Sequence, residues 1–349
     1  MTTVNQLNGR VQALVLSGGG TRGLYTISLL ATLENHYSNG DPDYNIADHF
    51  DIIGGTSIGG ILALGLASGV NARALKEVLD SNRKDIFPQN LWLLGSAYRF
   101  FRQLFGSKFS PKPLRKCIYS AVGDLKIKDL YTRVLIPALN GSTGAPKTFK
   151  TPHHPNFTRD GERKVIDVAL ATSAAPTYFP PHKMEDGLML DGGLWANLPA
   201  FSIYHELCND RFLNVDPQKV HMLAVGTMGT DVAIQAKSSG SSGYIGSWGL
   251  GKKLTAMMMD TTERWQTFMT QHNLGDRFVQ LDDRGAHNIE LDDSNDKSAE
   301  YMQFQAANNA QYALGSQNVR AFFEHQRQKV TFYTARGDEY EAGCKSSTK

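Results

Sequence analysis

Short apolar runs and longer periodic segments alternate along the first part of the chain. The run Val11–Leu16 and the run that starts at Phe50 are short, apolar and followed by glycine-rich turns, which is typical of buried strands. Each turn leads into a predicted helix, over about 24–36 in the first case and about 58–67 in the second. The second helix is apolar on every side, so we expect it to be buried. Two consecutive strand–turn–helix units predict an α/β fold with a largely parallel sheet.

The same pattern continues and gives way to helices towards the end of the chain. Further strands are predicted over 133–139, 148–150, 187–190 and 220–226, and further helices over 71–83, 165–173, 199–208, 253–272 and 299–329. A glycine- and serine-rich stretch, 238–251, is predicted to be a loop. We therefore expect one domain over 1–335, with a core at about 11–230, a helical extension at about 250–330, and a disordered tail at 336–349.

Residues 90–116 have a different composition from the segments around them. Aromatic and aliphatic side chains are interleaved there with basic ones, including Trp92, Phe100, Phe101, Phe109, Arg99, Arg102 and Lys108. That mixture suits a lid or a segment lying on a membrane surface. A pair of helices packed on the core, with its basic residues in water, explains the same pattern, and both interpretations remain open.

Composition and charge limit the class of protein. The chain has 349 residues, 41% of them hydrophobic, which is enough for a sizeable core, and its net charge of +2 gives no signature of binding a nucleic acid polymer. Cys117, Cys208 and Cys344 are few and far apart, so we expect a reducing compartment without disulfides. The chain has no apolar run of the ~20 residues that a membrane helix needs, and no signal-peptide core. We expect a cytoplasmic protein that contacts a membrane peripherally.

The first candidate for chemistry is a serine at the turn between the second strand and its helix. Gly55-Thr56-Ser57-Ile58-Gly59 matches the pattern G-x-S-x-G, in which a serine lies on a sharp strand-to-helix turn and glycines leave room for the backbone. Ser57 would then lie at a helix N-terminus, where negative charge is favoured. We predict that it is a nucleophile. A glycine turn that only allows close packing of helix and sheet is the alternative.

A serine nucleophile needs a base that takes its proton, and Asp191 is the candidate. It ends an apolar strand and precedes Gly192 and Gly193, which places a carboxylate at the edge of the sheet without steric cover. An aspartate before two glycines is otherwise an ordinary turn. The serine motif favours the catalytic interpretation.

The glycine-rich loop after the first strand is the candidate oxyanion hole. Backbone N–H groups of Gly18, Gly19 and Gly20 can stabilise a tetrahedral intermediate, with Gly23 in the same motif and Arg22 adding positive charge. Gly18-x-Gly20-x-x-Gly23 also matches a dinucleotide-binding fingerprint. That fingerprint requires an acidic residue at the end of the second strand, whereas Asp51 lies at its start. We expect no cofactor and no metal.

These motifs together resemble the patatin-like phospholipase family. Gly18–Gly23 is similar to its glycine-rich motif, Gly55–Gly59 to its serine motif and Asp191–Gly193 to its Asp-Gly-Gly motif, and the likeness extends over residues 11–229. Residues 171–180 and 194–199 are also similar to the family, and Ser17 departs from it at a position without a catalytic role. The resemblance implies a three-layer α/β/α core, a dyad of Ser57 and Asp191 without histidine, and hydrolysis of acyl esters of membrane phospholipids.

Two other functions remain possible from the sequence. An esterase with a Ser–Asp–His triad needs a histidine after Asp191, and the candidates are His205, His221, His272, His287 and His325. An inactive patatin-like scaffold that binds lipid or a partner is the second, although Ser57, Asp191 and the glycines are all present.

A narrower resemblance concerns regulation. Around residues 49–67 the chain is similar to bacterial patatin-like effectors of antiphage systems that signal with cyclic oligonucleotides. This implies activation by a cyclic dinucleotide such as cyclic GMP–AMP. Trp248, Lys252 and Lys253, in and next to the glycine- and serine-rich loop, are candidates to stack on a base and bind phosphates. Ordering of the loop would then open the site or drive formation of a homo-oligomer. A constitutive enzyme with an unregulated surface loop is the alternative.

Overall fold

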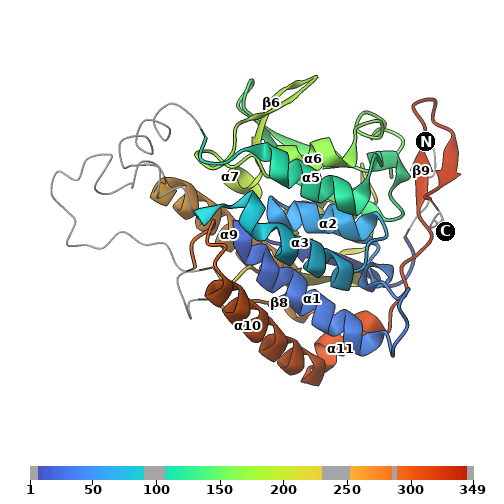
Figure 1. Ribbon diagram of the computed structural model, residues 1–349. Coiled ribbons are helices and arrows are strands. Elements are labelled where there is room, and N and C mark those ends of the chain that lie inside the picture. Colours follow the sequence, from blue (N-terminus) through green and yellow to red (C-terminus); the bar gives the residue numbers. More distant parts are fainter. Residues whose placement is uncertain (1–6, 90–106, 230–251, 285–288, 344–349) are drawn as a thin grey trace.

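A mostly parallel β-sheet lies between two layers of helices in the computed structural model, which describes residues 7–89, 107–229, 252–284 and 289–343 (Figure 1). The helices of the larger layer are α1, α2, α3, α5, α6, α10 and α11, and those near the opposite face are α7, α8 and α9. The three-layer α/β/α core that the sequence predicts is confirmed.

Eight strands form the main sheet within the described ranges, in the order β5-β6-β3-β2-β1-β7-β8, with β4 paired to β3. The pairs from β3 through β2, β1 and β7 to β8 are parallel, whereas β4, β5 and β6 pair antiparallel. The strands are β1 (Val11–Leu16), β2 (Ile52–Gly55), β3 (Arg133–Asn140), β4 (Ala145–Lys150), β5 (His182–Met184), β6 (Gly187–Asp191), β7 (Val220–Val225) and β8 (Phe278–Leu281).

Helices follow the strands as the apolar periodicity indicates. The α-helices are α1 (Gly23–Tyr37), α2 (Ile58–Ala67), α3 (Ala72–Ile86), α5 (Pro111–Val122), α6 (Val165–Thr172), α7 (Gly193–Ala196), α8 (Ala200–Cys208), α9 (Lys252–Leu274), α10 (Asp296–Gly315) and α11 (Gln317–Phe323). A short 3-10 helix, η1 (Gly20–Arg22), precedes α1. None of these described helices is long and apolar enough to cross a membrane.

Side chains of the central strand alternate between the two layers because successive residues of a strand point to opposite faces. Leu14 and Leu16 belong to the core under α1, α2 and α3, whereas Ala13 and Val15 pack with Ile203 of α8. Helix α2 is buried along almost all of its length, as its uniformly apolar sequence predicts. The elbow serine therefore lies between a fully buried strand and a helix that is buried along almost all of its length.

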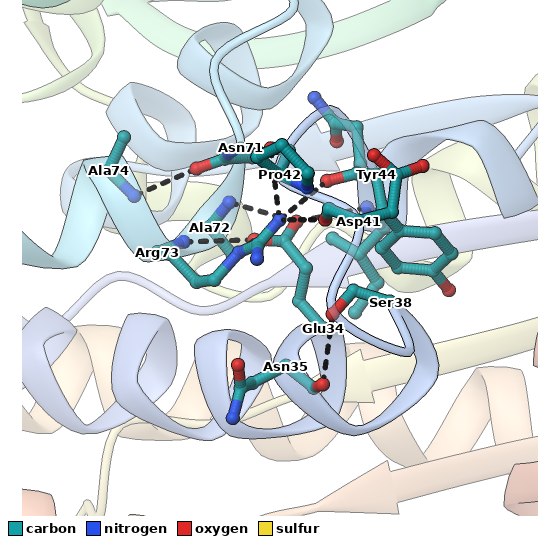
Figure 2. Close-up of polar contacts among 12 residues, drawn as sticks. Glu34, Asn35, Ser38, Asp41, Pro42, Tyr44, Asn71, Ala72, Arg73 and Ala74 are labelled. Carbon is teal, nitrogen blue, oxygen red and sulfur yellow. Dashed lines mark hydrogen bonds and ion pairs between the residues drawn. The ribbon is translucent and has the colours of Figure 1, made fainter.

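A buried carboxylate fixes the start of α3 and the segment that leads to β2. Glu34 of α1 accepts hydrogen bonds from the backbone N–H groups of Ile46, Ala72 and Arg73, and from the Arg73 Nε at 3.2 Å. Figure 2 shows Arg73 reaching on to the carbonyl groups of the connecting segment at Asp41, Pro42 and Tyr44. One glutamate thus satisfies N–H groups from two separate elements.

The C-terminal third differs from the prediction in three respects. Strand β8 extends the sheet beyond residue 230, pairing in parallel with β7. The single helix predicted at 299–329 is two helices, because Ser316 is extended after Gly315 and ends α10. The predicted tail is partly ordered, since β10 (Glu339–Glu341) pairs antiparallel with β9 (Thr331–Tyr333). Residues 344–349 lie outside the described ranges.

The aromatic and basic segment is only partly described. Trp92, Phe100, Phe101, Arg99 and Arg102 lie outside the described ranges, and their predicted role stays a prediction. In the part that follows, Phe109 is 3% exposed and packs edge-on against Phe87. Lys108 pairs with Asp292. The end of this segment is therefore packed on the core, and its first described lysine is an ion-pair partner.

Candidate active site

Ser57 lies on a strained turn between β2 and α2. Its φ is +56° and its ψ is −125°, a backbone conformation that residues other than glycine rarely adopt. A Cβ on Gly55 would lie 2.3 Å from the carbonyl oxygen of Gly59, and one on Gly59 would lie 2.4 Å from that of Leu16. The two flanking glycines are thus required by the crowded backbone, which is the geometry predicted for a nucleophile elbow.

Two threonines hold this turn in place. The Ser57 N–H donates to Thr172 Oγ1 at 3.1 Å, and the Thr172 hydroxyl donates to the Pro137 carbonyl at 2.6 Å. Thr56 Oγ1 donates to the carbonyl of Ala196 at 2.6 Å. No role was predicted for Thr172, although it lies in a stretch that resembles the family. Its position becomes clear only when α6 and β3 are placed beside the elbow.

Asp191 reaches the serine because β6 and β2 lie on either side of β3. Leu135 of β3 pairs with Gly54 of β2, and Ala138 pairs with Asp191 of β6. The end of β6 is therefore level with the residues that directly follow β2. Ser57 and Asp191 line the same cavity. The sheet brings together the two residues that the sequence predicted as nucleophile and base.

The Asp191 carboxyl is buried, with an exposed fraction of 1%. Burial raises its pKa to about 6, and the neighbouring Ser57 hydroxyl and the Gly193 N–H oppose that increase. The Gly193 N–H donates to Asp191 Oδ1 at 2.7 Å, while Oδ2 accepts no hydrogen bond from the described residues. Gly192 permits the turn, since a Cβ there would lie 2.4 Å from the Pro137 carbonyl oxygen. The pKa of this carboxyl thus lies closer to neutral pH than that of an ordinary aspartate, which suits a general base.

The glycine loop offers fewer free donors than its sequence indicates. The Gly18 N–H donates to the Asn197 carbonyl at 3.0 Å and is not free for an oxyanion. Within the described ranges the N–H groups of Gly19 and Gly20 have no acceptor. Gly20 has a φ of +60° and lines the cavity with Ser57. The candidate oxyanion donors are therefore Gly19 and Gly20.

The surroundings of Gly23 and Arg22 do not match the predicted place in the oxyanion hole. A Cβ on Gly23 would lie 2.2 Å from Ile58 Cγ1, so this glycine allows the close packing of α1 on α2. Arg22 is half-buried and is not among the described residues that line the cavity. Burial lowers its pKa, and the charges of Glu263 and Asp282 oppose that effect. Arg22 thus belongs to a charged cluster with the region of α9 and β8.

The cavity in front of Ser57 is apolar. It contains about 590 Å³ of empty space, including the solvent at its mouth. Its walls come from distant parts of the sequence, and they include Ile61, Leu79, Phe87, Leu114, Phe179, Thr255, Met259 and Leu291. A second apolar space between α2, α3, α5 and α6 shares Ile58, Ile61 and Leu79 with it, and its lining also includes Cys117, Ala121 and Ala169. An arrangement of this kind suits hydrocarbon chains.

No histidine in the described ranges lines this cavity. His325 contacts Asp51 at 2.9 Å, and Asp51 precedes the start of β2 whereas Ser57 follows its end. His205 lies in α8 and contacts Asn209, which directly follows that helix. His221 is on β7 and His272 is in the last turn of α9. His287 lies outside the described ranges. The geometry gives no support to a triad built from the described histidines.

The residues predicted to bind a cyclic dinucleotide are only partly placed. Trp248 lies outside the described ranges. Lys252 and Lys253 begin helix α9, and Lys253 is partly exposed. Their role stays a prediction.

Comparison with known proteins gives consistent matches over most of the chain. A family model described as patatin-like phospholipase matches residues 14–204. A protein of Vibrio cholerae serotype O1 named cGAMP-activated phospholipase is 43% identical over 302 residues, which cover 82% of this chain and 85% of the relative. A protein of the same name from Escherichia coli strain TW11681 is 40% identical over 337 residues, covering 90% and 93%. Among solved structures, VipD from Legionella pneumophila aligns over 91% of this chain and 67% of its own, at 12% identity and a TM-score of 0.46.

Proposed function

Because the chain belongs to the patatin-like phospholipase family, we propose that Ser57 and Asp191 are the catalytic dyad with which it hydrolyses acyl esters of membrane phospholipids. As a member of this family the protein is a phospholipase, a hydrolase of lipid esters. The observation that carries the proposal is the pairing of a strained serine with a buried carboxyl in one apolar cavity.

The reaction follows from the surroundings of the two residues. Ser57 Oγ attacks the ester carbonyl carbon, and the ionised Asp191 takes the hydroxyl proton. When the tetrahedral intermediate collapses, the C–O bond to the alcohol breaks and the alcohol leaves with that proton. Water, activated by Asp191 in the same way, then hydrolyses the acyl-serine and releases a fatty acid. A pKa of about 6 for Asp191 keeps most of the carboxyl ionised at neutral pH and still makes it basic enough to accept the proton.

The proposed oxyanion hole consists of the N–H groups of Gly19 and Gly20. Both belong to the loop that lies against the elbow, and neither donates to another described group. Preorganised backbone donors of this type contribute to transition-state stabilisation because they need no rearrangement during the reaction.

The substrate class follows from the cavity. Apolar walls and an adjoining apolar space favour long acyl chains over short soluble esters. Helix α9 supports a peripheral contact with the bilayer, since Thr255 and Met259 line the cavity while apolar side chains along the same helix are exposed. Those exposed side chains are Leu254, Met258, Trp265 and Phe268.

Regulation is the second part of the proposal. Two relatives that align over most of their length with this chain are named cGAMP-activated phospholipases. We infer that cyclic GMP–AMP activates this protein too, and that it acts in antiphage defence, as its resemblance to such effectors implies. Trp248, Lys252 and Lys253 remain candidates for binding the nucleotide, and formation of a homo-oligomer remains a candidate for the activating step.

The test measures fatty-acid release from vesicles of bacterial phospholipids by the purified protein, with and without cyclic GMP–AMP. We expect release that depends on this nucleotide, with other cyclic dinucleotides as controls. Full activity that no nucleotide changes would contradict the regulatory part and leave the hydrolase. No release under any condition would favour the inactive scaffold.

A further inference from the structure

A buried polar link joins the glycine loop to helix α9. Asn197, in the turn after α7, forms hydrogen bonds with both the N–H and the carbonyl group of Gly18. The Gly18 N–H donates to the Asn197 carbonyl at 3.0 Å, and Asn197 Nδ2 donates to the Gly18 carbonyl at 3.2 Å. A Cβ on Gly18 would lie 3.2 Å from Ser57 Cβ and 2.4 Å from Asn197 Oδ1. The position of Asn197 therefore fixes the backbone that lies against the nucleophile.

Asn197 is held in turn by Glu263 of α9. Asn197 Nδ2 donates to Glu263 Oε2 at 2.7 Å, and Arg284 Nη1 donates to Glu263 Oε1 at 3.1 Å. Asn197 is 3% exposed and Glu263 6% exposed. Each carboxylate oxygen thus has one donor inside the protein, and hydrogen bonds to a charged group at buried sites are among the stronger ones. Glu263 lies outside the residues 14–204 that the family model matches.

We propose that Glu263 is a positioning residue for the hydrolysis, which holds the Asn197 amide so that the glycine loop keeps the Gly19 and Gly20 N–H groups beside Ser57. This inference rests on the proposed function. The carboxylate is suited to the role because its two oxygens accept from two different donors. A glutamine has only one acceptor oxygen, so its amide N–H₂ would face either Asn197 or Arg284, donor against donor.

The charges around Glu263 make the link sensitive to pH. Burial raises the pKa of Glu263 to about 7, helped by Asp282 and opposed by Arg284, Asn197 and Arg22. Asp260 of the same helix pairs with Arg284 and Arg264. The ionised form accepts both hydrogen bonds, whereas a protonated oxygen would point a hydrogen at one donor. Activity should therefore rise as the pH increases through the pKa of Glu263, in addition to the rise that Asp191 causes.

The test compares Glu263→Gln with Glu206→Gln, which removes a different buried carboxylate. Glu206 pairs with Lys150 and His153, and within the described ranges its carboxylate makes no hydrogen bond or ion pair with the glycine loop. Both variants are checked by thermal unfolding. We expect Glu263→Gln to lower kcat by about 10- to 100-fold, less than the ~10²–10³ that loss of an oxyanion donor itself costs. KM should be unchanged and the rise near neutral pH should be lost. Glu206→Gln should keep the kcat and pH profile of the folded wild type.

A second variant approaches the link from its other end. Asn197→Ala should lower kcat at least as much, and the double variant should be no slower than Asn197→Ala alone, because both changes break one link. Additive losses, or a wild-type pH profile in folded Glu263→Gln, would overturn the proposal. If Glu263→Gln does not fold, a normal kcat in Asn197→Ala overturns it.

The rate at which Ser57 reacts with a fluorophosphonate separates this inference from the proposed function. That reaction needs the serine, the base and the N–H donors but no lipid. If wild type labels quickly and the two variants slowly while no membrane phospholipid is hydrolysed, Glu263 keeps its role and the proposed hydrolysis of membrane phospholipids fails.

Discussion

The ionisation of Asp191 gives the most specific prediction of the proposed mechanism. An ordinary aspartate has a pKa of about 3.9 and is ionised at pH 5. Burial raises the pKa of Asp191 to about 6. The ionised fraction is then roughly nine tenths at pH 7, half at pH 6 and a tenth at pH 5. Since only the carboxylate accepts the serine proton, turnover should rise with pH and fall at least about tenfold from pH 7 to pH 5.

The assay uses a short soluble ester in overlapping buffers, so that pH does not act through the surface charge of vesicles. Asp191→Asn keeps the shape of the side chain but loses the base. We expect kcat to fall by roughly 10²–10⁴-fold. The residual rate should lose the inflection near pH 6 and keep only the rise near pH 7 that Glu263 causes. Each of the candidate histidines is changed to alanine as the control, and folded variants should retain activity. Those control positions are His205, His221, His272, His287 and His325.

Two results would refute this reasoning. Equal wild-type turnover at pH 5 and pH 7 would show that no group with the raised pKa of Asp191 acts as the base. A folded histidine variant as inactive as Asp191→Asn would replace the dyad with a triad.

Three other substitutions test separate parts of the structure. Gly19→Val would place a Cβ 2.4 Å from Thr227 Oγ1 and displace the loop, so kcat should fall by at least ~10²-fold. Normal turnover would show that the oxyanion hole lies elsewhere. Glu34→Ala leaves three backbone N–H groups and the Nε of Arg73 without their acceptor and should lower the free energy of unfolding by about 3–5 kcal/mol in denaturant titration. A loss under about 1 kcal/mol would contradict the account. Ala121→Phe places a larger side chain in the second apolar space, which Leu79 and Ala121 both line, and should slow hydrolysis of long-chain esters but not of butyrate esters. Equal slowing of both esters would argue against binding of the acyl chain in that space.

Local sequence signals were sufficient for the elements that surround the serine. The apolar run before it, the glycines at the turn and the uniformly apolar helix after it correspond to β2, the elbow and α2. Asp191 could be named because it ends an apolar strand before two glycines. The position of Asp191 beside Ser57, however, depends on the antiparallel pairing of β6 with β3, which no local pattern in the sequence specifies.

The supporting residues depend on tertiary contacts and could not be predicted. Thr172 and Asn197 lie in stretches that resemble the family, but the atoms they hold come from other elements. Glu263 lies in a helix whose sequence has no strong apolar face, and its role follows only from its contacts with Asn197 and Arg284. The same limitation applies to Gly18, whose N–H is already used by Asn197.

Fatty-acid release by Ser57→Ala tests the central claim most directly. The variant loses one hydroxyl in a turn whose backbone glycines remain, so we expect the fold, followed by thermal unfolding, to be unchanged. Measured on phospholipid vesicles in the presence of cyclic GMP–AMP, release should fall to the background without enzyme while the wild type is active. A folded Ser57→Ala protein that kept most of the wild-type release would contradict the assignment of this serine as the nucleophile.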